Sequence, residues 1–250
     1  MVIMMEIVLE QKANLKGYTM IEGFPGAGLV GPMAISYLIE KMELRYIGHI
    51  ESDDFPPLVA VHHDVPMPPV RVYASDKAKL VTVLAEFAIP LDITYELTNK
   101  LYEFIKKNGI ARIVSIGGMP APQQTVALET VFGIASNDTM RKEVQKAGLK
   151  QIGEGVATGV SALMLMKSAS DGTPDISILV PVDPNILDPI YAELAIKSLN
   201  KLLSLKVDVN ELDKEAKEVE AKVRDLIKRG RDVQEMHKKS IDQAGPSMYA

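Results

Sequence analysis

Between about residue 18 and residue 182, short apolar runs alternate with segments in which apolar residues recur every three or four positions. The first pattern predicts buried strands and the second predicts helices packed on them. The predicted strands are residues 18–22, 45–50, 58–62, 69–74, 79–86, 111–116, 131–136 and 176–181. The predicted helices are residues 31–41, 92–108, 139–147, 159–167 and 188–203. The alternation predicts an α/β domain with one core and a largely buried sheet.

Three local signals refine these elements. The apolar run at residues 1–10 predicts a first strand. Asn108-Gly109 closes the helix at 92–108, because glycine readily ends a helix. Prolines gather between residues 55 and 69, around two short apolar runs. Since proline cannot donate to a sheet, this stretch predicts a sheet edge or a projecting hairpin.

After residue 205 the composition becomes charged, and the apolar or small residues keep a spacing of three and four. They are Val209, Leu212, Ala216, Val219, Val223 and Leu226. This spacing predicts a heptad seam on a coiled-coil-like helix, which favours a protruding arm or self-association over a helix packed on its own domain. The expected organisation is an α/β domain at 1–205, a C-terminal helix at 206–241 and a flexible tail at 242–250.

Composition narrows the classes of function. The chain has 250 residues, 47% of them hydrophobic, and a net charge of −5, so it can bury a core and has no overall positive field for nucleic acid. It contains no cysteine, which excludes disulfides and thiolate-bound metals. The N-terminus lacks a basic leader, and no apolar run reaches the ~20 residues of a membrane helix. We expect a soluble, cytoplasmic protein without nucleic-acid or membrane partners.

A glycine-rich turn follows the strand at 18–22 and opens the helix at 31–41. Its glycines are Gly23, Gly26, Gly28 and Gly31, and the last three match the G-x-G-x-x-G pattern of dinucleotide-binding turns. Pro25 and Pro32 flank them and fit that pattern poorly. We therefore favour a structural role, a tight turn with close packing, over cofactor binding. Gly117 and Gly118 form a second turn after the strand at 111–116, which is a possible wall of a pocket.

Candidate catalytic chemistry is sparse. His62 and His63 are adjacent, so on a strand they point to opposite faces and do not chelate one metal together. The chain has no H-x-x-x-H, G-x-S-x-G or P-loop motif. We predict no catalytic residue, no metal and no cofactor.

The chain ends in Met248, Tyr249 and Ala250. The stretch before them, residues 242–247, has little with which to build a core. A tyrosine ring supplies a large contact area with one polar group, and a terminal carboxylate can be held by a lysine or by backbone amides of a partner. The ending predicts a segment that a protein pocket captures.

Together, the glycine turn at 23–31, the Ser115-Ile116-Gly117-Gly118 turn and the final three residues resemble the archaeal members of the proteasome-assembly-chaperone family. The resemblance implies a three-layer α/β/α domain that is phosphorylase-like but lacks enzymatic activity, and it implies homo-oligomers. It also implies a hydrophobic-tyrosine-any-residue tail that enters pockets between α-subunits of the core proteasome. In that tail Met248 is the hydrophobic anchor, Tyr249 wedges the pocket and Ala250 supplies the carboxylate.

The resulting hypothesis is an ATP-independent proteasome assembly chaperone or activator. We expect it to form a homo-oligomer, a tetramer or pentamer, and to bind the α-ring of the core proteasome. A second family member is a further candidate partner. Weak single tails would gain from effective concentration in an oligomer. One alternative is a phosphorylase-fold enzyme that holds a nucleoside or phosphate at the glycine turns. Another is a scaffold for a different partner.

Overall fold

The structure is a computed structural model that describes residues 5–62, 64–121, 130–184, 186–210 and 212. Its centre is a mixed sheet of nine strands in the order β1-β3-β6-β7-β2-β8-β11-β9-β10. These strands are β1 (Glu6–Leu9), β2 (Thr19–Gly23), β3 (Arg45–Glu51), β6 (Val70–Ser75), β7 (Leu80–Ala85), β8 (Arg112–Pro120), β9 (Phe132–Ala135), β10 (Lys150–Gln151) and β11 (Asp175–Val182). Strands β4 (Ala60–His62) and β5 (Val65–Met67) form a separate two-stranded sheet.

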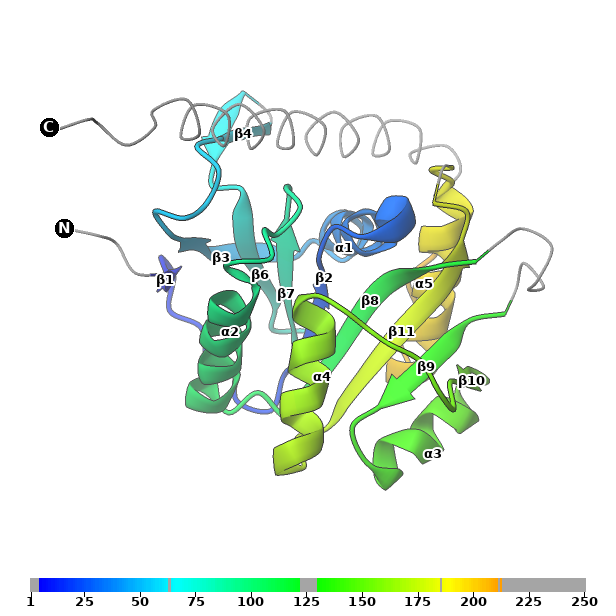
Figure 1. The fold of residues 1–250 in the computed structure, drawn as a ribbon. Helices are drawn as coiled ribbons and strands as arrows, with labels where there is room; N and C mark the ends of the chain where they lie inside the picture. The colour runs from blue at the N-terminus through cyan, green and yellow to red at the C-terminus, as the bar shows by residue number, and fades with distance from the viewer. Residues whose placement is uncertain (1–4, 63, 122–129, 185, 211, 213–250) are drawn as a thin grey trace, which may run out of the picture.

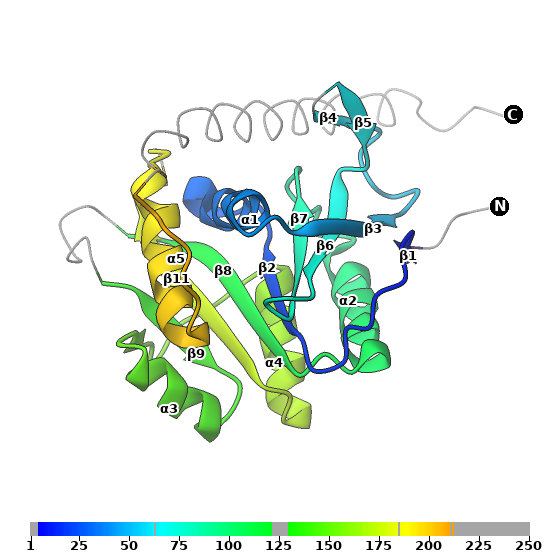
Figure 2. The same cartoon turned by 180° about the vertical axis from the view of Figure 1, so that it is seen from behind.

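Helices cover both faces of the sheet (Figures 1 and 2). They are α1 (Val30–Lys41), α2 (Thr94–Asn108), α3 (Asp138–Lys146), α4 (Val160–Asp171) and α5 (Pro189–Leu203), and a short 3-10 turn, η1 (Ala27–Leu29), precedes α1. Helices α1, α3 and α5 share one apolar cluster with one face of the sheet. Helices α2 and α4 share a second cluster with the other face. The buried strands therefore separate two apolar layers.

The direction of the strands defines two edges of the sheet. Strands β2, β7, β8 and β11 are mutually parallel, and β3 runs with them because two antiparallel pairings separate it from β7. Their C-terminal ends meet at what we call the carboxyl edge, and their N-terminal ends meet at the amino edge. Loops at the carboxyl edge of such sheets commonly carry function.

Most predicted elements are confirmed. Each predicted strand overlaps an observed one, and each of the five predicted helices is present. Gly109 ends α2 with φ of 63° in the left-handed region, as the Asn108-Gly109 signal predicted. The proline-rich stretch forms the β4–β5 hairpin outside the main sheet. Two short strands, β5 and β10, were not predicted.

The predicted fold class, a phosphorylase-like three-layer domain with a long coiled-coil extension, was wrong. The main sheet of the described chain is a mixed sheet of nine strands with five helices, in which β1, β6, β9 and β10 run against the parallel strands. The alternating pattern predicted helices and strands correctly but does not encode strand direction. The phosphorylase-like relation came from the resemblance alone, and nothing in the structure supports it.

The start of the predicted heptad seam packs on the domain itself. Leu212 is 4% exposed and belongs to the apolar cluster that α1, α3 and α5 share, here called the α1–α5 cluster, against which Val209 also packs. The Tyr37 hydroxyl donates to the Asp208 carbonyl over 2.7 Å. A spacing of three and four serves an intramolecular apolar face as well as a coiled coil. Ala216, Val219, Val223 and Leu226 lie outside the described residues.

Candidate functional site

The carboxyl edge carries a projecting hairpin and most of the exposed large apolar side chains of the described residues. The β4–β5 hairpin follows β3 and stands clear of the main sheet (Figure 1). Six exposed apolar residues follow β3, β7 or β11: Val59, Val61, Val65, Leu91, Tyr95 and Ile186. Val61 is 62% exposed and Leu91 is 85% exposed. These six side chains come from the segments that follow three strands, so exposed large apolar side chains are more frequent at this edge than elsewhere in the described residues.

A buried ion pair fixes the hairpin to the sheet. Arg71 on β6 is 1% exposed, and its Nη1 donates to Glu86 Oε2 over 2.8 Å. The Nε of Arg71 donates to the Tyr73 hydroxyl over 2.8 Å, and Nη1 also donates to the Pro68 carbonyl. His62 at the end of β4 places its Nε2 2.8 Å from Glu86 Oε1 and 3.1 Å from Arg71 Nη2. The hairpin is thus held in one orientation by side chains from the main sheet.

The charges of this network stabilise one another. Burial alone would raise the pKa of Glu86, but the hydrogen bonds from His62 and Arg71 and the positive charge of Arg71 outweigh it. The pKa of Glu86 therefore lies below its ordinary value. A buried pair of this kind specifies an orientation, and removing one partner leaves the other charge buried and uncompensated.

A cleft of mixed character lies at the base of the hairpin. Its volume is about 410 Å³, and apolar residues, among them Phe55, Leu58 and several prolines, line it together with the polar residues His49, Glu51, Ser52 and Asp53. Phe55 packs edge-on against the buried ring of Phe87, with 5.1 Å between the ring centroids. The cleft therefore offers both apolar and polar contacts beside the hairpin.

The two glycine turns meet at the carboxyl edge. A Cβ on Gly23 would come within 2.7 Å of the Gly31 backbone, and a Cβ on Gly31 would come equally close to Gly23 and to the Ile116 carbonyl. A Cβ on Gly118 would lie 2.0 Å from the Ala27 carbonyl. These three glycines let the backbones of β2, α1 and β8 approach closely, which is one of the uses of glycine in a sheet.

The other glycines of the two turns have different surroundings. Gly28 has φ of +64°, which favours glycine, and its α-carbon faces Val182. Gly26 and Gly117 are in looser surroundings. The first turn of α1 is buried, and Pro32 in it has no N–H to offer a ligand. This geometry gives a phosphate no open helix N-terminus.

Two buried acids lie beneath α4. Glu22 on β2 and Asp175 on β11 are both 0% exposed, and their carboxylate oxygens have no hydrogen-bond partner among the described residues. Burial raises the pKa of Glu22, and nearby hydroxyls, including that of Ser115, offset this only in part. Burial, with a smaller contribution from the charge of Glu22, raises the pKa of Asp175 to about 7. Neither acid was singled out by the sequence motifs.

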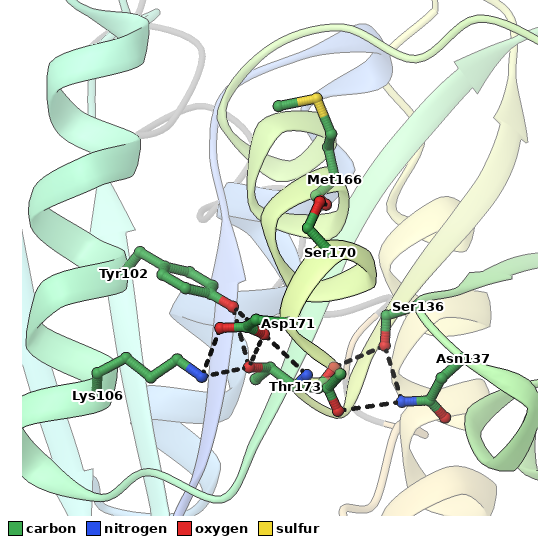
Figure 3. A network of polar contacts seen from close by, with 9 residues as sticks. Tyr102, Lys106, Ser136, Asn137, Met166, Ser170, Asp171 and Thr173 are labelled. Atoms are coloured by element: carbon green, nitrogen blue, oxygen red, sulfur yellow. Dashed lines mark hydrogen bonds and ion pairs between the residues drawn. The ribbon is translucent and has the colours of Figure 1, made fainter.

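The amino edge is closed by a polar network that joins α2, α4 and the start of α3 (Figure 3). Lys106 Nζ lies 2.7 Å from Asp171 Oδ2, and the Tyr102 hydroxyl donates to Asp171 Oδ1 over 2.7 Å. Ser136 donates to the Thr173 carbonyl over 2.7 Å. Burial would raise the pKa of Asp171, but the hydrogen bonds from Lys106, Thr173 and Tyr102 hold it well below its ordinary value. The network ties the C-terminal end of α4 to its neighbours.

The remaining predicted site residues divide into two groups. Met248, Tyr249 and Ala250 lie outside the described residues, as does His63. His62 was predicted to be a surface or edge histidine; it lies at the end of β4 with its side chain 35% exposed, and it also joins the Arg71–Glu86 network. Sequence reasoning missed this network because its members come from three separate strands and loops.

In the part of the chain that the structure describes, no three His, Asp or Glu side chains gather as a metal site would require. Within the same residues, no helix has the length and apolar character needed to cross a membrane.

Comparison with known proteins identifies the fold. The structure is similar to Pyrococcus furiosus PbaA, an archaeal homologue of proteasome-assembly chaperone, with a TM-score of 0.82 and 26% identity over 93% of this chain and 99% of that chain. It is also similar in fold to Pyrococcus furiosus PbaB, an archaeal proteasome activator, with a TM-score of 0.72 and 23% identity over 89% of this chain and 98% of that chain. These likenesses replace the phosphorylase-like assignment.

Sequence comparison agrees with the structural one. A Methanocaldococcus jannaschii protein is 32% identical over 231 residues, which covers 90% of this chain and 92% of the relative. The PAC2 family model matches residues 20–227, and this range includes the β4–β5 hairpin, both glycine turns and the polar network of the amino edge. The chain therefore belongs to the PAC2 family.

Proposed function

We propose that this protein is an ATP-independent proteasome assembly chaperone or activator, and that it acts by binding rather than by catalysis. The likeness to PbaA over nearly the whole of both chains carries this proposal, and membership of the PAC2 family supports a proteasome-related role. The absence of a P-loop motif from the sequence supports independence from ATP.

The proposed contact with the core proteasome is the C-terminal tail. Met248 is the apolar anchor, Tyr249 fills a pocket between adjacent α-subunits and the carboxylate of Ala250 pairs with a pocket lysine. A flexible methionine loses rotamer freedom on binding, so one tail binds weakly. A homo-oligomer, a tetramer or pentamer, presents several tails and gains affinity through effective concentration. Such a partner places the protein in the cytoplasm, and a second family member is a further candidate partner.

The geometry of the glycine turns favours this proposal over an enzyme. A nucleoside or phosphate site at Gly26–Gly31 would need open backbone amides, whereas the first turn of α1 is buried and contains Pro32. Gly23, Gly31 and Gly118 are occupied by contacts between backbones. We assign no catalytic residue, cofactor or metal to the chain.

The experiment that tests the proposal is co-sedimentation with an archaeal core proteasome, with peptide hydrolysis measured in the same fractions. Full-length protein is expected to bind and to change hydrolysis, whereas deletion of residues 248–250 or Tyr249→Ala abolishes both effects. Ser247→Ala is the matched control, because it alters the tail next to the motif and leaves the motif intact.

The outcomes separate the alternatives. Equal binding by the full-length and deleted proteins would contradict tail docking and indicate a scaffold that binds through the globular domain. Failure of full-length protein to associate with the core particle or its α-subunits at micromolar concentration would contradict the proteasome-related role itself. Saturable turnover of a nucleoside that is lost on altering the glycine turns would revive the enzyme alternative.

A further inference from the structure

Strand β1 is the outermost strand on one side of the main sheet and lies next to a groove. In the part of the chain that the structure describes, β1 is the terminal strand of the sheet and pairs only with β3. Between β1 and α2 lies a groove of about 400 Å³ with Met5, Ile7 and Phe104 among its apolar lining residues. Lys100, Glu103 and Lys107 of α2 also line it. A free strand edge beside a groove offers a place for another strand to pair.

The α2 face along this groove alternates in charge. Glu96, Lys100, Glu103 and Lys107 are spaced by four, three and four residues, so they lie along one side of the helix. Glu96 faces β1, because its Oε1 accepts from the Met5 amide over 3.3 Å. When a second α2 helix is turned by 180° and placed opposite the first, the order acid, base, acid, base on one helix faces base, acid, base, acid on the other. A two-fold axis between Lys100 and Glu103 would place every charge opposite one of the other sign.

The register of β1 leads to the same position for the axis. In an antiparallel pair of β1 strands, directly opposed side chains lie on the same face of the sheet. A two-fold axis between two copies must therefore pass beside a residue, such as Ile7 or Val8, and not between two residues. Pairing about Val8 sets Glu6 opposite Glu10 of the second copy, which places like charges together. Pairing about Ile7 sets Glu6 opposite Val8 and continues the apolar lining with Met5 opposite Leu9. The favoured axis therefore passes beside Ile7.

Ideal strand and helix geometry brings the two positions to within about one turn of helix. Both β1 and α2 run from the carboxyl edge to the amino edge, because β1 opposes β3 while α2 connects the end of β7 to the start of β8. From Met5 to Ile7 the strand advances about 7 Å, which equals about four to five residues of helix. Starting from the Met5–Glu96 contact, this places Ile7 beside Lys100, and both residues line the groove.

We propose that β1 and the charged face of α2 form a two-fold interface with a second copy of this chain. The β1 strands pair antiparallel about Ile7, and the α2 helices set Glu96 against Lys107 and Lys100 against Glu103 of the second copy. Such an interface is isologous and closes with two copies. It builds a dimer, or a tetramer with two-fold axes, and it excludes a pentamer held by this contact. The inference does not depend on the C-terminal tail or on the proteasome.

The test uses two variants of the full-length chain with opposite charge. Lys100→Glu with Lys107→Glu makes the α2 face wholly acidic, and Glu96→Lys with Glu103→Lys makes it wholly basic. Each variant alone is expected to raise the dissociation constant for self-association by roughly tenfold or more, because four opposed pairs become like-charged. An equimolar mixture is expected to restore a complex with one copy of each variant, read by analytical ultracentrifugation and native mass spectrometry.

The control is Lys142→Glu with Lys146→Glu on α3, whose side chains are exposed and lie away from the groove. This control is expected to keep the wild-type assembly. Circular dichroism melting establishes that each variant folds, and either variant alone is decisive if the other fails to fold. A monomeric wild type at high micromolar concentration, variants that keep the wild-type mass, or a mixture that stays dissociated would each overturn the proposal.

Discussion

The carboxyl edge and the amino edge of the sheet are held by different kinds of polar contact. At the amino edge, Lys106, Asp171 and Thr173 join helices through short polar contacts. At the carboxyl edge, the Arg71–Glu86 pair is buried and supports a hairpin whose outer valines remain exposed. Exposed ion pairs contribute little to stability, whereas a buried pair is costly to break and holds one geometry. The comparison indicates that partly exposed, weak contacts link the helices at the amino edge, whereas a buried ion pair holds an oriented hairpin at the carboxyl edge.

The largest expected effect comes from breaking the buried pair at the carboxyl edge. Arg71→Leu leaves the Glu86 carboxylate buried without its cation, and we expect a loss of about 3–5 kcal/mol in the free energy of unfolding. Urea denaturation measures this loss, and limited proteolysis of residues 52–69 is expected to accelerate. Adding Glu86→Leu should recover most of the stability. A loss below about 1 kcal/mol for Arg71→Leu would show that the hairpin does not depend on the pair.

The buried acid at the start of β11 predicts a dependence on pH. The pKa of Asp175 rises from 3.8 to about 7 on folding, so between these values the folded state binds more protons than the unfolded state. Its contribution to stability is complete below the unfolded pKa and is lost as the pH rises to about 7, by on the order of 2–4 kcal/mol. Asp175→Asn is expected to remove this contribution and to leave that of Glu22, whose pKa burial also raises.

Urea denaturation at several values between pH 4 and pH 8 measures the change. The control is Glu154→Gln, because Glu154 is exposed and lies outside the buried core. A wild-type protein whose stability is constant across the interval would contradict the assignment of Asp175 as a protonated buried acid.

The glycine contacts at the carboxyl edge predict an intermediate effect. A Cβ at Gly31 would lie 2.7 Å from backbone atoms of Gly23 and Ile116, which have no flexible side chain to move aside. Gly31→Ala is expected to lower the free energy of unfolding by about 1–3 kcal/mol through overpacking. Gly26→Ala is the matched control from the same turn, since its nearest contact is 3.9 Å away. Equal losses for the two variants would refute close packing as the role of Gly31.

The smallest expected effect belongs to the amino edge. The side chain of Asp171 is 40% exposed and that of Lys106 is 50% exposed, so solvent screens their attraction. Asp171→Asn is expected to lower stability by about 0.5–1 kcal/mol, and the loss should shrink in 1 M salt. Thermal denaturation at two salt concentrations measures it, with the exposed Glu154→Gln as control. A loss as large as that of Arg71→Leu would erase the difference between the two edges.

The sequence predicted local structure far better than it predicted the network at the carboxyl edge. Apolar periodicity located the strands and helices, and the prolines marked the hairpin, because these signals act over a few residues. The pairing of Arg71 with Glu86 and His62 depends on how β6, β7 and the hairpin meet, which no local pattern records. Strand direction also depends on how distant segments meet, so the sequence did not predict that the sheet is mixed.

Two further features of the sequence allowed a fuller prediction. Glu22 ends an apolar strand, and an acid in such a run indicates a buried carboxyl group. The 3-4 spacing at Val209 and Leu212 was assigned to a projecting arm, although both residues pack on the α1–α5 cluster. Periodicity identifies an apolar face but not the surface that covers it.

The contact between Tyr37 and Asp208 bears on how the protein is made. The two residues are 171 positions apart, and the segment that contains Asp208 helps to cover α1. A ribosome adding about 5–20 residues per second needs roughly 9–34 s to reach Asp208 after Tyr37. During that interval the outer side of α1 lacks its cover, so the domain completes its core only after the segment around Asp208 has been made.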